Sequence, residues 1–312
     1  MGDSHEQLRA GYGKRRGLPE KPVSVALATA SALADLWAGD RLFLDELRRR
    51  GYEAAPRTWD DKGVDWGAWD LVVIRSCWDY HLKIERFRSW IADLERAGVR
   101  LVNPPDVLRW NMHKGYLLEV ARAGGRIPAT RLVSKGSPRS LGDELRHAGW
   151  PSAVIKPAIS ASGHSTRLID GQPRDEDERA YEEMRTNGDV LLQVYVPEVR
   201  QHGEWSLVFF EGRYSHAALK RAAPGEFRVH IEWGGTVERS EPPPALVREA
   251  QAVIDALDLG ATYARVDGTE VDGHLVVMEL ELIEPELFFD CHPDATTRLA
   301  DALSRVLRVP DQ

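Results

Sequence analysis

Residues 263–285 read YARVDGTEVDGHLVVMELELIEP and contain the strongest structural signal in the chain. Asp272-Gly273 is a strong turn signal between two apolar runs, which predicts a β-hairpin. The second run is apolar on both faces except at Glu279 and Glu281. Residues two apart in a strand share a face, so both carboxylates point the same way.

The register of this hairpin decides where Asp267 lies. A two-residue turn places Asp267 on the face opposite to the two glutamates. A three-residue loop, or one β-bulge, instead places Asp267 across from Glu279. Arg265 then lies across from Glu281. The second arrangement gathers three acids and an arginine on one face of a half-buried hairpin.

Acidic side chains packed together in an apolar strand are costly unless a cation lies among them. The candidate cations are Arg265 and a divalent metal. Oxygen-only ligands on a rigid hairpin suit Mg²⁺, which keeps several waters and takes further ligands from substrate phosphates. The alternative is a solvated edge strand with scattered acids, which the apolar flanking residues disfavour.

The composition is typical of a globular protein. The chain has 312 residues, is 43% hydrophobic and 29% charged, and carries a net charge of −8. We therefore expect two or three subdomains and no nucleic-acid partner. Its two cysteines, Cys77 and Cys291, form no CxxC pair, which favours a reducing cytoplasm over a disulfide framework or a zinc site. No apolar run is long enough to span a bilayer, so we expect no membrane association.

The N-terminal segment has two interpretations. Arg15-Arg16 precede a mildly apolar run, residues 23–34, which imitates a secretory or twin-arginine signal. However, prolines interrupt the approach, and the run is mostly Ala, Ser and Thr. We therefore favour a disordered polar tail over residues 1–21, followed by a first strand at residues 23–29.

The next part of the chain alternates in the order β-α-β-β-α-β, which predicts a small, open, mostly parallel sheet. The loop RSCWDYH, residues 75–81, follows the third strand at its carboxyl end, where such sheets bind ligands. It is either a substrate loop or a packed tryptophan with a capping aspartate. The expected strands are residues 23–29, 52–58, 69–76 and 99–103, and the expected helices are residues 39–50 and 85–97.

Two lysines and a small-residue loop are candidates for anion binding. Lys114 lies in a predicted helix, residues 111–123, where a lone lysine is usually solvated. Lys156 lies inside an apolar strand, residues 153–157, and buried lysines are rare unless paired. The loop AISASGHST, residues 158–166, follows directly, and its backbone N–H groups are free to fold over an anion. It is neither a P-loop nor a dinucleotide fingerprint, because GxxxxGK[ST] and GxGxxG are both missing.

The second half of the chain adds further polar positions. Gln193 is the one strongly polar side chain in an apolar strand, and Lys220 lies near the end of a hairpin. The segment GEFRVHIEWGG, residues 225–235, indicates a mobile flap that ends in paired glycines. Further expected strands are residues 130–133, 190–196, 204–210 and 213–221, and further expected helices are residues 139–148, 175–186, 242–257 and 295–307.

The order of these features resembles the ATP-grasp superfamily. A lysine precedes a small-residue loop, and then come a strand with a polar residue, a lysine, an arginine, a glycine pair and an Asp…Glu-x-Glu hairpin. The resemblance covers residues 23–289. It implies an α/β and α+β protein, in which two α+β subdomains, residues 111–190 and 191–312, enclose ATP. A small α/β pre-ATP-grasp domain, residues 22–110, precedes them.

The resemblance also implies nucleotide contacts by position. The two lysines would grip the α- and β-phosphates, and the loop would cover them. The strand around residue 193 would contact adenine through one side chain and two backbone positions. A glutamate would form hydrogen bonds with the ribose hydroxyls. The residues with these implied roles are Lys114, Lys156, Ser160, Ser162, Gly163, Gln193, Val194, Val196 and Glu204.

Further roles follow for the cationic and acidic side chains. The resemblance implies that Lys220 and Arg228 contact the transferring phosphate and that Arg265 lies beside the acyl oxyanion. The implied ligands of two Mg²⁺ ions, with Mn²⁺ as the alternative metal, are Asp267, Glu279 and Glu281. The third ligand is an asparagine in glutathione synthetase and D-alanine–D-alanine ligase. The extra charge of the glutamate here either tightens metal binding or pairs with Arg265.

The implied reaction is acyl activation. A carboxylate attacks the γ-phosphorus of ATP to give an acyl phosphate and ADP, and an amine then attacks the carbonyl and expels phosphate. EWSLVFFEGRYSHAALKRAAPGEFRV, residues 204–229, and ELELIEPELFF, residues 279–289, look most like the glutathione-synthetase-like branch. That branch includes the cyclo-ligase of cycloserine biosynthesis. Glu286 is then a candidate contact for the amine of an amino-acid substrate, and a surface salt bridge is its alternative.

The expected function is therefore an ATP-dependent carboxylate–amine ligase that acts on a small amino-acid-like substrate in the cytoplasm, with intramolecular cyclisation as one form of the reaction. One alternative is an intermolecular peptide- or glutathione-synthetase-like ligase. Another is a nucleotide-binding protein without catalysis, and a third is a plain α/β binding domain. Related ligases are often dimers, so a homodimer is the expected assembly.

Overall fold

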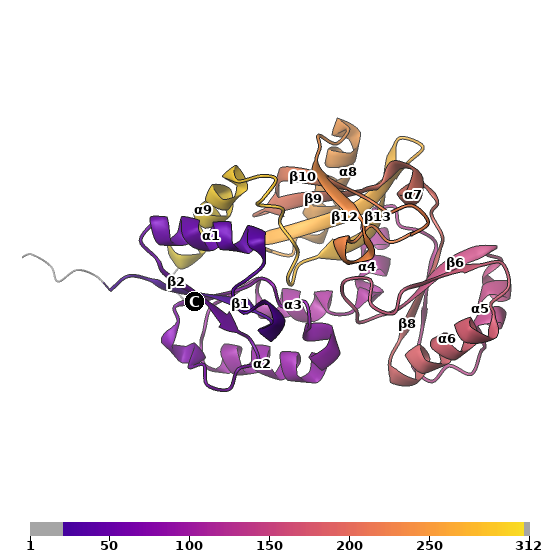
Figure 1. Ribbon diagram of the computed structural model, residues 1–312, viewed down its shortest axis with the longest axis horizontal. Helices are drawn as coiled ribbons and strands as arrows, with labels where there is room; N and C mark the ends of the chain where they lie inside the picture. The colour runs from indigo at the N-terminus through magenta and orange to yellow at the C-terminus, as the bar shows by residue number, and fades with distance from the viewer. Residues whose placement is uncertain (1–20, 309–312) are drawn as a thin grey trace, which may run out of the picture.

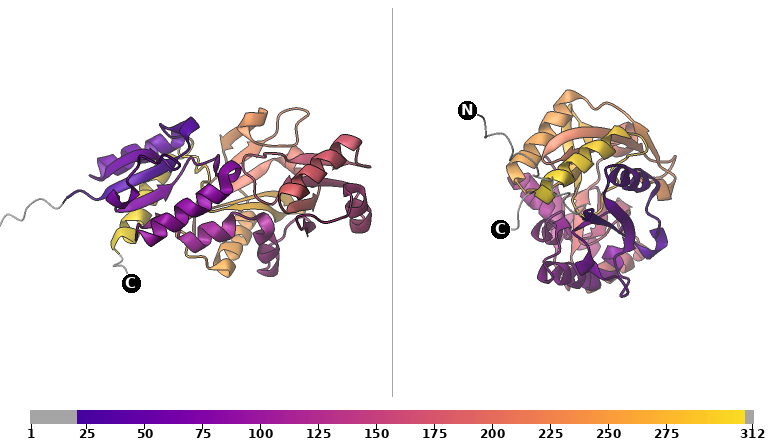
Figure 2. Two further views of the ribbon diagram at one scale, coloured as in Figure 1. Left: turned by 90° about the horizontal axis from the view of Figure 1, so that it is seen from below. Right: turned by 90° about the vertical axis from the view of Figure 1, so that its left-hand side faces the viewer.

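The computed structural model describes residues 21–308, which form three sheets in an elongated molecule (Figure 1). The N-terminal sheet lies at one end, the sheet of β5 to β8 lies at the other, and the largest sheet lies between them (Figure 2). The predicted polar tail, apart from Lys21, and the Arg15-Arg16 motif lie outside the described residues. Within residues 21–308, no helix combines the length and the apolarity that crossing a membrane requires.

The N-terminal sheet is fully parallel, in the order β2-β1-β3-β4, as the alternation of elements predicted. Its central strands are buried on both faces because helices cover both sides. Short 3-10 helices follow β1, β2 and β3. The elements are β1 (Ser24–Thr29), η1 (Ser31–Leu33), α1 (Ala38–Arg49), β2 (Glu53–Thr58), η2 (Trp66–Ala68), β3 (Leu71–Ile74), η3 (Tyr80–Lys83), α2 (Ile84–Arg96), β4 (Leu101–Val102) and α3 (Pro105–Asn111).

The sheet at the opposite end is antiparallel, in the order β5-β8-β6-β7. Two helices pack their apolar faces on one side of it (Figure 1). The edge strand β7 was not predicted, because four residues with one buried side chain give too short a pattern. The elements are β5 (Thr130–Val133), α5 (Leu141–Ala148), β6 (Ser152–Pro157), β7 (Arg167–Asp170), α6 (Asp175–Asn187) and β8 (Val190–Val194).

The largest sheet has the order β11-β10-β9-β12-β13 and carries an apolar core on each face. Helices α4 and α8 pack on one face, and the C-terminal helix α9 packs on the other, beside α1 (Figure 1). The short elements α7 and β11 were not predicted. The elements are α4 (Leu117–Arg122), α7 (Glu198–His202), β9 (Glu204–Phe210), β10 (Arg213–Arg221), η5 (Ile231–Trp233), β11 (Thr236–Arg239), α8 (Pro244–Leu257), β12 (Tyr263–Val271), β13 (His274–Glu281) and α9 (Asp294–Arg308).

The hairpin of β12 and β13 combines a two-residue turn with one β-bulge. The bulge shifts the register next to Asp267, which pairs with Glu279, while Arg265 pairs with Glu281. Gly268 is required at this point, because a Cβ atom there would lie 2.6 Å from a backbone carbonyl oxygen of β13. The register that places all three acids on one face is therefore confirmed.

The predicted helix over residues 111–123 is confirmed only at α4, and its first half is wrong. The chain breaks after α3 and forms the 3-10 turn η4 (Lys114–Tyr116) before α4 begins. The backbone N–H of Lys114 donates to the carbonyl oxygen of Ala158 at 2.7 Å, and His113 Nδ1 accepts from Gly115 N at 3.1 Å. These two bonds replace helical ones and bring Lys114 against the small-residue loop. Its side chain is consequently buried, with 6% exposure, and not solvated.

Asn103 ties the N-terminal sheet to the hairpin. The residue is fully buried after β4. Its Nδ2 donates to the carbonyl oxygens of Tyr263 and Leu282 at 2.9 and 2.7 Å. Its Oδ1 accepts from the backbone nitrogens of Thr262 and Tyr263 at 2.7 and 3.2 Å. One side chain therefore satisfies backbone groups at the start of β12 and after the end of β13.

We expect Asn103→Ala to lower the free energy of unfolding by about 2–4 kcal/mol, because buried backbone groups would lose their partners. Urea unfolding followed by circular dichroism measures the change. Asn187→Ala is the control, since that exposed amide donates to one helical carbonyl oxygen, and we expect it to cost at most about 0.5 kcal/mol. Equal stability of the two variants would contradict this role for Asn103.

Candidate active site

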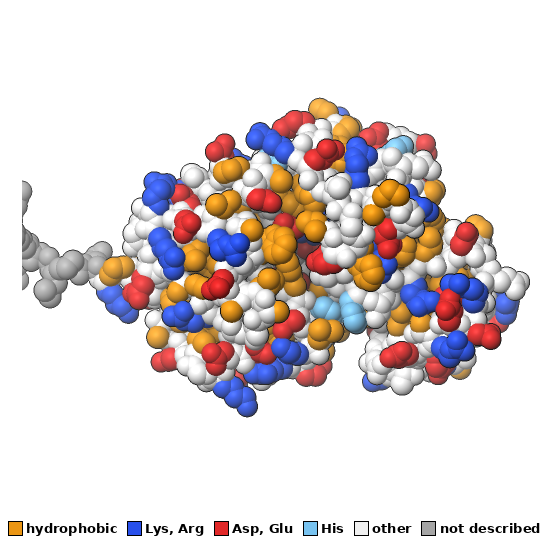
Figure 3. All heavy atoms as spheres, in the orientation of Figure 1, with side chains coloured by type: hydrophobic (Ala, Val, Ile, Leu, Met, Phe, Trp, Pro, Cys, Tyr) orange, Lys and Arg blue, Asp and Glu red, His pale blue; other side chains and the backbone are white. Residues whose placement is uncertain are grey.

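A cavity of about 290 Å³ lies where the three sheets meet. Figure 3 shows its mouth as a hollow in which acidic side chains lie deep among hydrophobic ones. Every residue that the sequence predicted for nucleotide, metal or catalytic contacts lines this one cavity. Residues that are distant in sequence therefore share one site, because the loop after β6, the strand β8, the segment after β10 and the bulged hairpin all face it.

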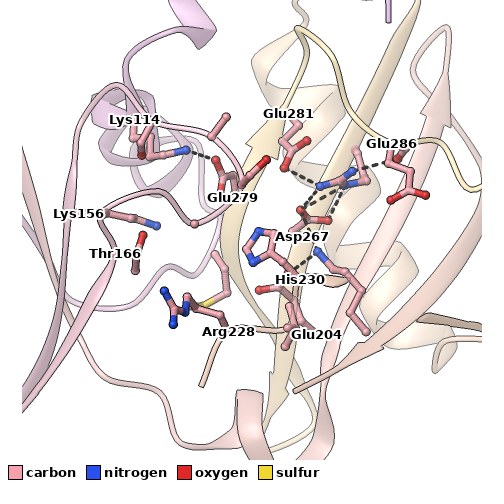
Figure 4. A pocket seen from close by; sticks show the side chains of 18 of the residues that line it. Lys114, Lys156, Thr166, Glu204, Arg228, His230, Asp267, Glu279, Glu281 and Glu286 are labelled. Carbon is pink, nitrogen blue, oxygen red and sulfur yellow. Dashed lines mark hydrogen bonds and ion pairs between the residues drawn. The ribbon is translucent and has the colours of Figure 1, made fainter. Parts of the chain in front are cut away.

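The acidic face of the hairpin forms one wall of the cavity. Asp267 on β12 and Glu279 and Glu281 on β13 all face it (Figure 4). Within residues 21–308, no three acidic, histidine or cysteine side chains are close enough together to bind a metal as they stand. Each of the three acids instead has a cationic partner.

Arg265 is the partner of two of these acids. Its Nη2 lies 2.8 Å from Asp267 Oδ2 and 2.5 Å from Glu281 Oε1. Ser206 Oγ also donates to Asp267 Oδ1 at 2.6 Å. Burial alone would raise the pKa of Asp267, but the charges of Arg265 and Lys220 hold that pKa well below its usual range. Burial dominates at Glu281 and raises its pKa.

Two lysines approach the remaining acid from the opposite wall. Lys114 forms an ion pair with Glu279, and the amine of Lys156 points into the same space (Figure 4). Both lysines lower the pKa of Glu279 against the effect of its burial. Burial lowers the pKa of Lys156 to about 8, since its amine forms no ion pair within the described chain. An anion placed between the two lysines would therefore find one amine already free of a protein partner.

Lys220 lies between two acids. Its Nζ is 2.5 Å from Glu204 Oε1 and 3.4 Å from Asp267 Oδ2. These neighbours raise the pKa of Lys220 even though burial lowers it. Burial raises the pKa of Glu204. The side chain of Lys220 is therefore held as a cation next to the acidic face of the hairpin.

The end of the cavity near β8 is mostly apolar. Side chains of β6, β8 and β13 line it, and they include Val154, Val196 and Met278. Gln193 Nε2 donates to Thr130 Oγ1 at 3.0 Å, and Val194 N donates to a carbonyl oxygen at 2.9 Å. An apolar slot with backbone groups at its edge is suitable for a planar base.

The small-residue loop and the flap touch each other across the cavity. A Cβ atom on Gly163, which has a φ of +64°, would lie 3.4 Å from Arg228 Cδ and 3.5 Å from ring atoms of His230. Ser160 Oγ donates to the carbonyl oxygen of Pro157 at 3.0 Å, and Ser162 has a φ of +51°. The flap therefore lies closed over the loop.

Arg228 lines the cavity but does not contact the acidic face. Its Nη2 lies 2.7 Å from Glu226 Oε2, and its guanidinium lies 3.2 Å from the centre of the Trp233 ring. Both partners belong to the flap. The contact with phosphate that was predicted for Arg228 therefore requires its guanidinium to leave Glu226.

Sequence reasoning missed His230 and Trp37. His230 is buried close to Asp267 (Figure 4), and its Nδ1 has no hydrogen-bond partner among the described residues. Burial lowers the pKa of His230 to about 4, so its ring is neutral at pH 7. Trp37 precedes α1 and lines the cavity from the N-terminal sheet. Neither residue belongs to a periodic pattern that could have revealed it.

The predicted substrate loop also reaches the cavity. Trp78 and Tyr80 line it, and Arg75 and Ser76 are buried below them and bond the Asp40 carboxylate at 2.9 and 2.7 Å. Asp79 accepts from an indole nitrogen of the domain core. The aromatic side chains of the loop therefore face the cavity, whereas Asp79 precedes η3 without capping it through its side chain, so the predicted capping aspartate is wrong.

Comparison with known proteins agrees with this arrangement. Residues 25–103 match the family model described as the N-terminal domain of D-cycloserine synthetase DcsG. The chain is 32% identical over 279 residues to cycloserine biosynthesis protein DcsG of Streptomyces lavendulae, which covers 85% of this chain and 92% of that protein. The crystal structure of D-cycloserine synthetase DcsG superposes with a TM-score of 0.82 at 27% identity, covering 91% of this chain and all of that one.

A more distant structure shares the fold. D-alanine–D-alanine ligase from Bacillus anthracis superposes with a TM-score of 0.64 at 17% identity, covering 91% of this chain and 97% of that one. The fold and the cavity thus define an ATP-grasp enzyme, an ATP-dependent carboxylate–amine ligase that forms C–N bonds. Within this class, the chain belongs to the DcsG family.

Proposed function

We propose that this enzyme is a cyclo-ligase of the cycloserine type, which joins a carboxylate to a hydroxylamine-type nitrogen within one small amino-acid-like molecule. The observation that carries the proposal is the 32% identity with DcsG over 279 residues, which cover 85% of the chain.

ATP would lie across the cavity from the apolar slot to the acidic face. The slot with Gln193, Val194 and Val196 supports a site for adenine, and Glu204 lies where it can accept from ribose hydroxyls once Lys220 turns toward phosphate. The positions of Lys114 and Lys156 support contacts to the α- and β-phosphates. The loop with Ser160, Ser162 and Gly163 offers backbone N–H groups to the same phosphates.

Mg²⁺ is the metal that fits the acidic face. Asp267, Glu279 and Glu281 present oxygen atoms from one rigid hairpin, which is the ligand type that Mg²⁺ prefers. Each of the three acids already pairs with a lysine or an arginine, so the hairpin attracts positive charge. When bound, Mg²⁺ would neutralise charge that develops on the transferring phosphate. A pair of ions, with Mn²⁺ as a substitute, is the expected occupancy.

The chain's own residues would act mainly by position and charge. The substrate carboxylate attacks the γ-phosphorus, an acyl phosphate forms and ADP leaves. The nitrogen then attacks the carbonyl carbon, the C–N bond forms, and phosphate leaves with the C–O bond electrons. Lys220 and Arg228 would contact the transferred phosphate, and Arg265 would stabilise the oxyanion. The closed flap would exclude water, to which an acyl phosphate is sensitive.

The test is ADP release by the purified enzyme with Mg-ATP and a panel of O-substituted D- and L-serines, with product identified by mass spectrometry. A cyclic product from a single substrate supports the proposal. Turnover that requires two substrates would instead establish an intermolecular, glutathione-synthetase-like ligase. Stabilisation by ATP without turnover would establish a non-catalytic nucleotide-binding protein. The cytoplasmic location and the homodimer stay predictions.

The contact between loop and flap gives a further prediction. We expect Gly163→Val to lower kcat/KM by about 10- to 100-fold, because a branched side chain at a positive φ strains the loop and displaces Arg228 and His230. Uncoupled ATP hydrolysis should rise as the flap opens. Gly171→Val is the control, since Gly171 also has a positive φ but lies away from the cavity with nothing within 4 Å of its Cβ position. Equal activity of both variants would contradict the closed contact.

A further inference from the structure

Residues 284–286 follow β13 and are held rigidly at the end of the cavity opposite the apolar slot. Their three successive carbonyl oxygens each accept from a different side chain. Trp78 Nε1 donates to the first at 3.1 Å, Arg75 Nη2 to the second at 2.6 Å, and Arg265 Nη1 to the third at 3.0 Å. This segment therefore presents its two carboxyl groups, Glu284 and Glu286, in fixed positions.

Neither of these two carboxyl groups forms a salt bridge within residues 21–308, although the charge of Lys114 acts on Glu284 and that of Arg265 acts on Glu286. Glu284 is 8% exposed, lines the cavity and accepts a hydrogen bond from its own backbone N–H. Glu286 also lines the cavity, and its Oε1 accepts from Trp37 Nε1 at 3.0 Å. The acids of the hairpin face differ, because each of them is bonded to a lysine or an arginine.

Two tryptophan side chains stand beside these acids. The rings of Trp37 and Trp78 lie 5.2 Å apart, inclined at 55°, and both line the cavity. Each indole N–H is bound to the acidic segment, Trp37 to the carboxylate of Glu286 and Trp78 to the carbonyl oxygen of Glu284. The N–H edges of both indoles are thereby fixed on the acidic segment, and the two rings lie beside its carboxyl groups.

This combination selects a cation of a particular kind. Burial and the charge of Glu281 raise the pKa of Glu284 well above its ordinary value, so a cationic ligand would relieve an existing electrostatic cost. Aromatic faces attract organic cations, and carboxylates bond N–H donors with directional hydrogen bonds. A primary ammonium group satisfies both, whereas a divalent metal gains nothing from the indoles.

We propose that Glu284, Glu286, Trp37 and Trp78 form a binding site for the primary ammonium group of the substrate. The inference rests on the proposed ligase function and specifies its substrate as an amino acid whose α-amino group stays free during the reaction. Arg265 connects this site to the acidic face, since it bonds both the Glu286 carbonyl oxygen and Asp267. The ammonium site therefore adjoins the place where the carboxylate would be activated.

The test compares two rings that differ by the amino group. Isothermal titration calorimetry on the full-length protein measures the affinity for D-cycloserine and for isoxazolidin-3-one, which is the same ring without the amine. We expect the wild type to bind D-cycloserine at least about 10-fold more tightly than isoxazolidin-3-one. Glu284→Gln and Glu286→Gln should each lower the affinity for D-cycloserine by about 10-fold and leave the affinity for isoxazolidin-3-one unchanged.

Glu232→Gln is the matched control, because it removes a negative charge from an exposed flap residue that lines the same cavity. We expect it to change neither affinity by more than about 2-fold. Equal affinity of the wild type for the two rings, or binding of neither, would overturn the ammonium site. An equal loss of affinity for both compounds in the Glu284→Gln variant would also overturn the ammonium site, since a purely structural role of Glu284 predicts that result.

The ligase assay separates the two proposals. If the wild type makes a cyclic product but binds the two rings with equal affinity, the ligase function is supported and the ammonium site is contradicted. If the wild type binds D-cycloserine more tightly than isoxazolidin-3-one but turns over no serine derivative, the ammonium site is supported and the cycloserine-type function is contradicted.

Discussion

Replacing Glu279 with glutamine is expected to reduce turnover by about 1,000-fold or more, which corresponds to about 4 kcal/mol in activation free energy. Glu279 pairs with Lys114 and also feels the charge of Lys156, so a cation bound there would connect the hairpin with a triphosphate held by these two lysines. Glutamine keeps the size of the side chain but removes the charge that attracts the metal. Single-turnover assays with saturating ATP measure the loss.

The fold should survive this change. Glutamine can still accept a hydrogen bond from Lys114, and the backbone pairing of Glu279 with Asp267 does not depend on the charge. Circular dichroism and the melting temperature should therefore change little. Asp267→Asn is expected to lose activity to a similar degree, but with a larger cost in stability, because Asp267 is fully buried between Arg265, Lys220 and Ser206.

Glu270→Gln is the control for this pair of variants. Glu270 lies on the same strand as Asp267, beyond the bulge and outside the cavity. Its replacement should leave kcat within about 2-fold of the wild type. Near-normal turnover of Glu279→Gln or of Asp267→Asn, in protein that is folded and saturated with Mg-ATP, would remove the metal assignment.

Lys156→Ala is expected to weaken ATP binding by about 100-fold, or about 2.7 kcal/mol. Lys156 is half-buried and its amine points into the cavity, yet it forms no ion pair within residues 21–308. A bound phosphate would supply the missing partner. Lys135→Ala is the control, because Lys135 is an exposed lysine outside the cavity. Equal ATP affinity of the two variants would contradict the phosphate contact.

The pKa of Lys156 adds a dependence on pH. Burial lowers this pKa to about 8 in the protein without ATP, so the amine is charged below pH 8 and loses its proton above it. Phosphate favours the charged amine, so binding above pH 8 must take up a proton. We therefore expect ATP affinity to be constant below pH 8 and to fall as the pH rises from 8 to 9.5. Lys156→Ala should abolish this decrease of ATP affinity with pH. A wild-type affinity that stays constant up to pH 9.5 would contradict the contact of Lys156 with phosphate.

Several features of the site were readable from local sequence. The apolar run with Glu279 and Glu281 predicted a strand with two acids on one face, because side chains alternate with a period of two. A lysine inside an apolar strand, Lys156, and a polar residue inside another, Gln193, stood out against their neighbours. The parallel N-terminal sheet followed from the alternation of strands and helices.

Other features depended on the packing of distant segments. The choice between two hairpin registers was settled by a bulge at Gly268, and the local sequence allowed both. The local pattern predicts a helix around Lys114, in which a lone lysine is usually solvated, because nothing near it in sequence reveals that its backbone pairs with the loop after β6. His230 and Glu284 carry no periodic signal, and their burial arises only where the flap and the N-terminal sheet close over the hairpin.

The amino-acid sequence by itself thus determined most of the strands and the longer helices, and which of their side chains share a face, since turn chemistry and periodicity act over a few residues. The tertiary structure decided which charges meet. Lys114 reaches Glu279 across 165 residues and Trp37 reaches Glu286 across 249, and contacts of that range depend on how sheets pack against one another. The cavity and its unpaired acids exist because of that packing.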